Sequence, residues 1–146
     1  MAHAKLVEQE QYTFHYPVTI GPQHLSLGNH LGADNVILLA SAARADVFHS
    51  MGLTEGDLGD GVTGIIVADI VVNYRTEGFL HDEIVIDTQI GAFTGRSFTA
   101  FQRIRRGEKV IAIAETGIVT FNYRSKRIAL VPERFLQVLA AHHSNT

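Results

Sequence analysis

A long apolar segment, residues 35–49 (NVILLASAARADVFH), limits how this chain can fold. The segment is too long for a strand, contains neither Gly nor Pro and is rich in Ala and Leu, so it predicts an α-helix. Apolar residues surround its first three turns and leave no polar face. We therefore expect a central helix that the rest of the protein encloses.

Segments rich in β-branched and aromatic residues predict the strands that pack around this helix. The first is residues 12–20, where Pro17 indicates an edge strand or a bulge. An antiparallel meander then follows the helix, with strands at residues 63–75, 83–93, 96–105 and 109–123. A loop at 76–82 and two short hairpin turns, Thr94–Gly95 and 106–108, join these strands. Residues 131–141 predict a short helix with Pro132 in its first turn, and the tail 142–146 is expected to fray.

This order of elements predicts an α+β fold in which a long, curved antiparallel sheet wraps the apolar helix. At 146 residues the chain fits a single domain, residues 1–146, which buries about 70% of the surface of its unfolded form. Long strands at an uncovered sheet edge favour pairing with a second copy, so we expect at least a dimer.

Composition narrows the function classes. An apolar fraction of 46% and a formal charge of −3 argue against disorder and against nucleic-acid binding. The absence of cysteine excludes a thiolate metal site and a cysteine nucleophile, and the eight histidines show no metal-ligand spacing, so we expect no metal. The N-terminal residues show no signal peptide, and no segment reaches the roughly 20 apolar residues of a membrane span. We expect a cytoplasmic protein that does not bind a membrane.

The order of several sequence blocks resembles the hotdog-fold acyl-CoA thioesterases of the 4-hydroxybenzoyl-CoA thioesterase type. The resemblance covers residues 14–135 and rests on the blocks GNHLGAD, AAR, MGLTEGDLGDGVTGIIVADIVVNYRTEGFLHDEIVI, SFTAFQRI and IAIAETGIVTFNYRSKRIALVPERF. It implies the hotdog fold, dimers or tetramers with active sites between subunits, and hydrolysis of an acyl-CoA or acyl-carrier thioester. Coenzyme A would enter as part of the substrate, with no separate cofactor.

The segment before the helix departs from the family pattern, Asp-x-Asn-Tyr-Gly-Asn-His-Leu-Gly-Asn-Asp. Six positions match the pattern: Gly28, Asn29, His30, Leu31, Gly32 and Asp34. Four differ, since His24, Ser26, Leu27 and Ala33 replace Asp, Asn, Tyr and Asn. The carboxylate that relatives place upstream of the helix, to attack the thioester or activate water, is therefore missing. Asp34 is the nearest remaining carboxylate, and we expect Asp34→Asn to keep the fold but remove most hydrolysis.

Thioester hydrolysis needs donors for the developing oxyanion, and the free amides at a helix N-terminus supply them. Gly32 and Ala33 are the candidates. Asp34 is either catalytic or caps its own helix, and the two uses compete because a capping carboxylate occupies the same amides. His30 either orients water and polarises the carbonyl or ties the loop together. Asn29 is either a hydrogen-bond donor or a turn residue.

Substrate binding has its own candidates. His24 replaces the family aspartate as a base or redirects the activity, and Ser26 lies beside it in the sequence. Basic runs at 103–109, with Arg105 and Arg106, and at 123–127 suit the phosphates of coenzyme A or form solvated hairpin ends. The resemblance adds Gly95, Arg96 and Ser97 near the pantetheine or phosphates. Arg44 in the apolar helix is expected to pair with a neighbouring acid.

Two other functions remain open at this point. A hotdog hydratase or dehydratase would move a proton on the acyl chain and leave the thioester intact. A catalytically silent protein that binds acyl-CoA or acyl carriers would agree with the missing upstream carboxylate. The sequence does not specify the acyl group.

Overall fold

The computed structural model describes residues 4–144 and confirms the α+β architecture. Its elements are β1 (Phe14–Thr19), η1 (Pro22–His24), α1 (Ala33–Ser50), β2 (Thr63–Tyr74), β3 (Glu83–Gly91), β4 (Ser97–Arg106), β5 (Lys109–Asn122), β6 (Arg127–Ile128) and α2 (Glu133–Ser144). No helix within this part of the chain is long and apolar enough to span a bilayer.

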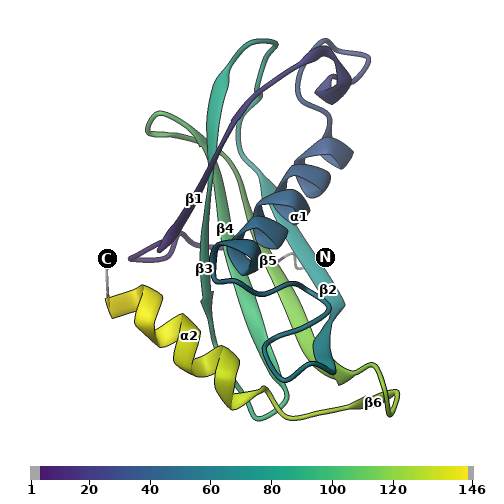
Figure 1. The fold of residues 1–146 in the computed structure, drawn as a ribbon. Helices are drawn as coiled ribbons and strands as arrows, with labels where there is room; N and C mark the ends of the chain where they lie inside the picture. The colour runs from purple at the N-terminus through teal and green to yellow at the C-terminus, as the bar shows by residue number, and fades with distance from the viewer. Residues whose placement is uncertain (1–3, 145–146) are drawn as a thin grey trace.

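The strands form one antiparallel sheet in the order β1-β3-β4-β5-β2, with the short β6 beside β5. Pro17 lies in β1, at an edge of the sheet, where its missing amide leaves no ladder bond unmade. Since β1 and β2 occupy opposite edges, the intervening α1 runs across the face of the sheet, as Figure 1 shows.

The core lies between this face and the helices. The first half of α1 packs Val36 and Leu39 with Ile86 and Ile104 of the sheet. The second half packs Phe48 with Phe98 and with Phe135 of α2, whose ring centroid is 5.8 Å from that of Phe48. Burial of these apolar surfaces is the main force that holds α1 and α2 on the sheet.

The sheet of one chain encloses α1 only in part, contrary to the prediction from the apolar segment. Leu38 keeps 64% of its surface exposed, and Ala42 one turn later is also exposed. The physical reason is that a single sheet contacts one side of a helix. The predicted pairing of Arg44 is confirmed, because its Nε donates to Glu55 at 2.8 Å.

Other local predictions were wrong. The β3–β4 connection is not a two-residue turn but spans residues 92–96, with Ala92 at φ 51° and a 2.5 Å hydrogen bond between the hydroxyls of Thr94 and Ser97. The supposed frayed tail is helical through residue 144, and His142 stacks on Phe14 with centroids 6.0 Å apart. Its last two residues, Asn145 and Thr146, lie outside the described part.

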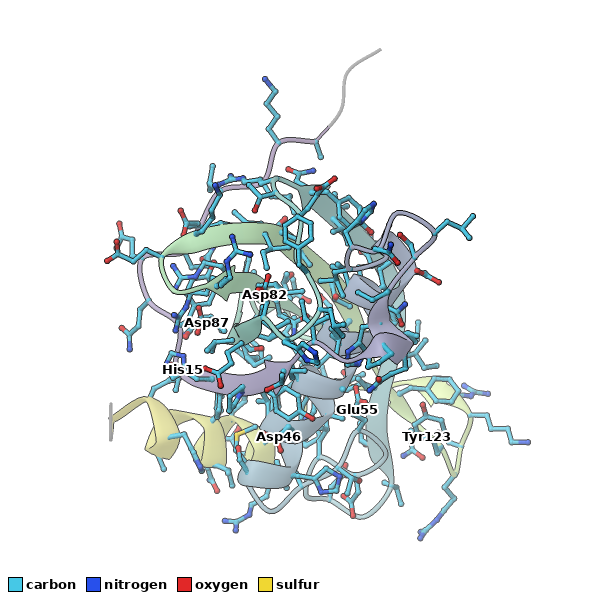
Figure 2. The ribbon with its side chains drawn as sticks, turned by 90° about the horizontal axis from the view of Figure 1, so that it is seen from above. His15, Asp46, Glu55, Asp82, Asp87 and Tyr123 are labelled. Carbon is cyan, nitrogen blue, oxygen red and sulfur yellow. The ribbon has the colours of Figure 1, made fainter. Side chains whose placement is uncertain are left out.

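A network of charged side chains centres on Asp87 of β3, which is fully buried. Its carboxylate accepts hydrogen bonds from His15 Nδ1 at 2.6 Å, Arg103 Nε at 2.8 Å and Arg105 Nε at 2.7 Å. Figure 2 shows His15 and Asp87 beside β1. The same view shows Asp46 on α1 and Glu55 close to that helix. Burial favours the neutral acid, but the hydrogen bonds from Arg105, His15 and Arg103 outweigh it and hold the pKa of Asp87 below its usual range.

We predict that Asp87→Asn destabilises the protein by about 3 kcal/mol at pH 7, because it leaves the partly buried guanidinium groups of Arg103 and Arg105 without their counter-charge. Because the pKa of Asp87 is lowered on folding, this carboxyl group adds to the free energy of unfolding at pH values above its unfolded-state pKa of about 3.9. That contribution is lost as the pH falls through the folded-state pKa. The gap between wild type and variant should therefore narrow below about pH 4. Urea unfolding between pH 7 and pH 3 measures this, with exposed Asp46→Asn as the control. A constant gap over this range would contradict the assignment.

Candidate functional site

The segment that enters α1 is a compact loop held by its own hydrogen bonds. The Gly32 amide donates to the His24 carbonyl at 2.9 Å, and the Ser26 amide donates to the His30 carbonyl at 2.9 Å. His24 Nδ1 accepts the Gly21 amide at 3.0 Å. Asn29 is exposed and adopts φ 58°. The side chain of His24 and the backbone of Ser26 and Asn29 therefore shape the loop that positions the helix terminus.

The N-cap of α1 is Gly32, not Asp34, and no side chain caps it. Asp34 Oδ1 instead accepts the Asn35 amide at 3.0 Å. A Cβ on Gly32 would lie 2.7 Å from this Oδ1, so glycine leaves room for the carboxylate. Within residues 4–144 the Ala33 and Asp34 amides donate to no partner. The carboxylate and an oxyanion thus use different amides, and the competition expected from the sequence does not arise.

The loop between β2 and β3, residues 75–82, lies against this terminus. The Leu31 amide donates to the Gly78 carbonyl at 2.7 Å, and His30 forms a β-bridge with Phe79. The loop is closed at Asp82, whose Oδ2 accepts the Phe79 amide at 2.9 Å. That hydrogen bond, more than the one from Arg106, holds the pKa of Asp82 below its usual range despite partial burial.

These two segments and the end of β2 border a cavity of about 190 Å³ that is open to solvent. Its lining residues are His30, Leu31, Ala33, Tyr74, Thr76 and Glu77. The Tyr74 hydroxyl donates to the Ala33 carbonyl at 2.8 Å, which ties β2 to the first turn of α1. Burial, followed by the negative charge of Asp34, raises the pKa of Tyr74, so the hydroxyl keeps its proton near neutral pH.

His30 has a defined tautomer in this cavity. Its Nδ1 lies 3.1 Å from the Leu31 carbonyl oxygen, and because a carbonyl only accepts, Nδ1 carries the hydrogen. Nε2 of the neutral ring is then an acceptor. Asp34 lies beside the cavity rather than in its lining.

Glu77 is the residue that sequence reasoning missed. It places a carboxylate in the same cavity as Ala33 and His30. The sequence signal is modest: an acid precedes Gly78 in the predicted loop between two strands. Its proximity to the helix terminus follows only from the pairing of residues 30–31 with 78–79, which are far apart in the chain.

The remaining predicted residues lie elsewhere. Gly95 and Arg96 belong to the β3–β4 connection and Ser97 begins β4, beside Phe98 and the second half of α1, at the opposite end of the sheet in Figure 1. Arg105 donates to Asp87 and to the Gly107 carbonyl, and Arg106 donates to Asp82. A larger cavity of about 460 Å³ borders Arg105, between β1 and β3, but no helix terminus opens into it. We therefore assign the candidate site to the smaller cavity.

Within residues 4–144, no three His, Asp or Glu side chains are grouped as a metal site requires. That the protein uses no metal stays a prediction.

Comparison with known proteins gives a family and a fold. The family model described as the thioesterase-like superfamily matches residues 20–139. No curated protein sequence matches the chain.

Three of the similar solved structures illustrate the fold. A hypothetical protein from Staphylococcus aureus in complex with CoA is 17% identical, with TM-score 0.81 over 97% of this chain and 90% of its own. A 1,4-dihydroxy-2-naphthoyl-CoA thioesterase from Synechocystis is 13% identical, with TM-score 0.78 over 87% and 95%. The probable thioesterase YbaW from Escherichia coli is 19% identical, with TM-score 0.72 over 86% and 96%. These likenesses confirm the hotdog fold.

We predict that Tyr74→Phe loosens the first turn of α1 because it removes the hydrogen bond to the Ala33 carbonyl. The expected loss of unfolding free energy is about 0.5–1.5 kcal/mol. Tyr123→Phe is the matched control, since its hydroxyl donates to the Ile65 carbonyl at 2.6 Å and both tyrosines are 49% exposed. Similar losses are expected, but only Tyr74→Phe should shift the backbone NMR signals of residues 33–35. Unchanged signals there would refute the coupling.

Proposed function

Since the chain belongs to the thioesterase-like superfamily, we propose that it hydrolyses an acyl-CoA thioester to a carboxylic acid and free coenzyme A. The observation that carries this proposal is the pair of unpartnered amides, on Ala33 and Asp34, at the start of α1 beside a cavity. Similar structures described as thioesterases, and one in complex with CoA, support the substrate class.

In the proposed reaction the helix terminus stabilises the transition state. When water attacks the thioester carbonyl, negative charge develops on its oxygen, and the amides of Ala33 and Asp34 donate to it with the positive end of the helix dipole behind them. Gly32 leaves room for the Asp34 carboxylate beside these amides, since a Cβ at this position would meet it. A preorganised donor pair of this kind lowers the barrier by about 2.7–4 kcal/mol per donor.

Polar side chains beside the terminus position the water. We assign Nε2 of His30 as an acceptor for a water hydrogen, since Nδ1 is already bonded to Leu31. The Asp34 carboxylate, held by the Asn35 amide, polarises the same water. Asn29, His24 and Ser26 support the reaction through the shape of the loop.

Coenzyme A needs a partner for its phosphates. Arg105 and Arg106 already pair with Asp87 and Asp82, whereas the exposed Arg96 side chain makes no ion pair within residues 4–144. Arg96, with its neighbours Gly95 and Ser97, is the preferred candidate. It lies far from the cavity of its own chain, so we assign it to the cavity of a second copy.

A homodimer through the β2 edge would provide that second copy. β2 has no partner strand on its outer side among residues 4–144, and Ile66, Val67 and Ala68 are exposed along it. Exposed Leu38 and Ala42 of α1 add apolar surface. Burial of a long, apolar edge strand against its own copy removes unpaired amides and carbonyls from an exposed position.

A thiol-release assay over short, long and aromatic acyl-CoA substrates and an acyl-carrier thioester tests the function. Free thiol is expected from at least one substrate. A changed acyl chain with an intact thioester would instead indicate a hydratase or dehydratase. Binding of a nonhydrolysable analogue with no thiol release from any substrate would indicate a silent binding protein.

We predict that Asp34→Asn folds with a stability change within about 1 kcal/mol, because the carboxylate is exposed and in the first helical turn. Thiol release should fall at least tenfold, since the amide side chain polarises water far less than the carboxylate does. Asp46→Asn, on the same helix and also exposed, is the control. Turnover near that of wild type would remove Asp34 from the mechanism.

We predict that Val67→Lys converts a dimer into a monomer, because a charged side chain in the middle of the β2 edge would be desolvated on pairing. Thr19→Lys, on the exposed β1 edge, is the matched control and should leave the dimer intact. Analytical ultracentrifugation at several protein concentrations gives the oligomeric state. A monomeric wild type, or dissociation by Thr19→Lys alone, would contradict the β2 interface.

A further inference from the structure

We propose that Glu77 is the general base that takes the proton from the attacking water. The proposal rests on the proposed function and identifies the group that replaces the carboxylate missing before α1. Its basis is geometric: of the carboxylates near the helix terminus, Asp34 lies beside the cavity, whereas Glu77 lines it.

The chain pairing places Glu77 next to the oxyanion donors. His30 bridges Phe79 in antiparallel register, and the Leu31 amide donates to the Gly78 carbonyl at 2.7 Å. One step further along the same register brings Glu77 alongside Gly32, whose successor Ala33 carries a free amide. Base and oxyanion donors thus border one cavity of about 190 Å³.

The segment that carries Glu77 is well fixed, which a catalytic group requires. On one side, the Thr76 hydroxyl donates to the Val110 carbonyl at 2.9 Å. On the other, Gly78 is buried, and a Cβ there would lie 3.0 Å from Ile20 and 3.4 Å from Leu31. Residues on both sides of Glu77 therefore have little freedom, so the backbone that carries this side chain is held beside the cavity before substrate binds.

The other polar groups are less suited to accept the proton. Asp34 Oδ1 already accepts the Asn35 amide, and the Asp34 side chain is not part of the cavity lining. His30 has one free ring nitrogen, which orients the water. The Glu77 carboxylate makes no hydrogen bond or ion pair within residues 4–144, so both of its oxygens are available.

The steps balance with water as the only co-substrate. The water oxygen forms a bond to the acyl carbon while one water proton moves to the Glu77 carboxylate, and the carbonyl oxygen becomes the oxyanion held by the two amides. Collapse of this intermediate breaks the carbon–sulfur bond. The departing thiolate takes the proton from the Glu77 carboxylic acid, which leaves a carboxylic acid product, free thiol and the original carboxylate.

The test compares Glu77→Gln with Glu83→Gln in the thiol-release assay. Both substitutions remove one exposed glutamate charge near the same end of the sheet, and Glu83 makes no hydrogen bond or ion pair through its side chain in the described chain. We expect kcat of Glu77→Gln to fall by about 10²–10⁴ with KM changed by less than threefold, as for loss of a general base. Glu83→Gln should retain the wild-type kcat.

Two further readouts separate catalysis from a structural effect. In the wild type, kcat/KM plotted against pH should fall on the acid side. This acid limb should disappear in Glu77→Gln but persist in Asp34→Asn. Added formate should restore activity to Glu77→Ala, because a small carboxylate can occupy the space left by the side chain, and should not restore Glu77→Gln.

The outcomes distinguish the two proposals. A wild type that releases thiol and a Glu77→Gln variant with more than one third of its kcat would overturn the role of Glu77 and leave the function standing. The role of Glu77 would also be overturned if Glu77→Gln had a low kcat but kept the acid limb of its pH profile, and formate failed to restore Glu77→Ala. A wild type that releases no thiol from any substrate overturns both.

Discussion

The placement of α1 on the sheet is the constraint on which the candidate site depends. Apolar contacts along both halves of the helix fix its distance from the sheet, and Gln102 adds a directional link. This buried side chain donates to the Ala40 carbonyl at 2.8 Å and to the Thr88 hydroxyl at 3.1 Å. Helix amides point along the helix axis, so whatever sets the axis also sets where an anion can bind.

Three arginines near this end of the sheet form ion pairs with acids. Arg103 and Arg105 pair with Asp87, and Arg106 pairs with Asp82. None of these three arginines lines the cavity at Ala33. Fixed backbone dipoles need no reorganisation when charge develops, whereas a flexible arginine would have to be ordered first.

The fold was more predictable from the sequence than the site was. Periodicity and composition located each long strand and the apolar helix to within a few residues, because those patterns follow from burial. The β3–β4 connection was mispredicted because the Thr94 and Ser97 hydroxyls stabilise a wider turn than its Thr-Gly pair suggested.

Within the site, His30 and Ala33 were predicted and do line one cavity. Asp34 was predicted as a possible cap, but the helix begins at Ala33, two residues earlier than a cap at Asp34 requires, so the Asp34 carboxylate accepts the Asn35 amide instead. Glu77 and Tyr74 were missed because they reach the helix terminus through pairings between distant segments. No local pattern encodes such a pairing.

The strand order also determines how the molecule assembles in time. β4 and β5 meet through a tight hairpin, Arg106 opposite Lys109, whereas β1 pairs with β3 only after the whole of α1 and β2 has been made, Phe14 opposite Thr88. Closing such long loops costs conformational entropy before any contact offsets it, so the β4–β5 hairpin forms early and the edges late. The contacts between residues 30–31 and 78–79 belong to the late set. Because β2 is held in the sheet through β5, the ribosome must deliver β5 before the cavity can exist, and any shorter nascent chain carries the apolar helix without its complete sheet.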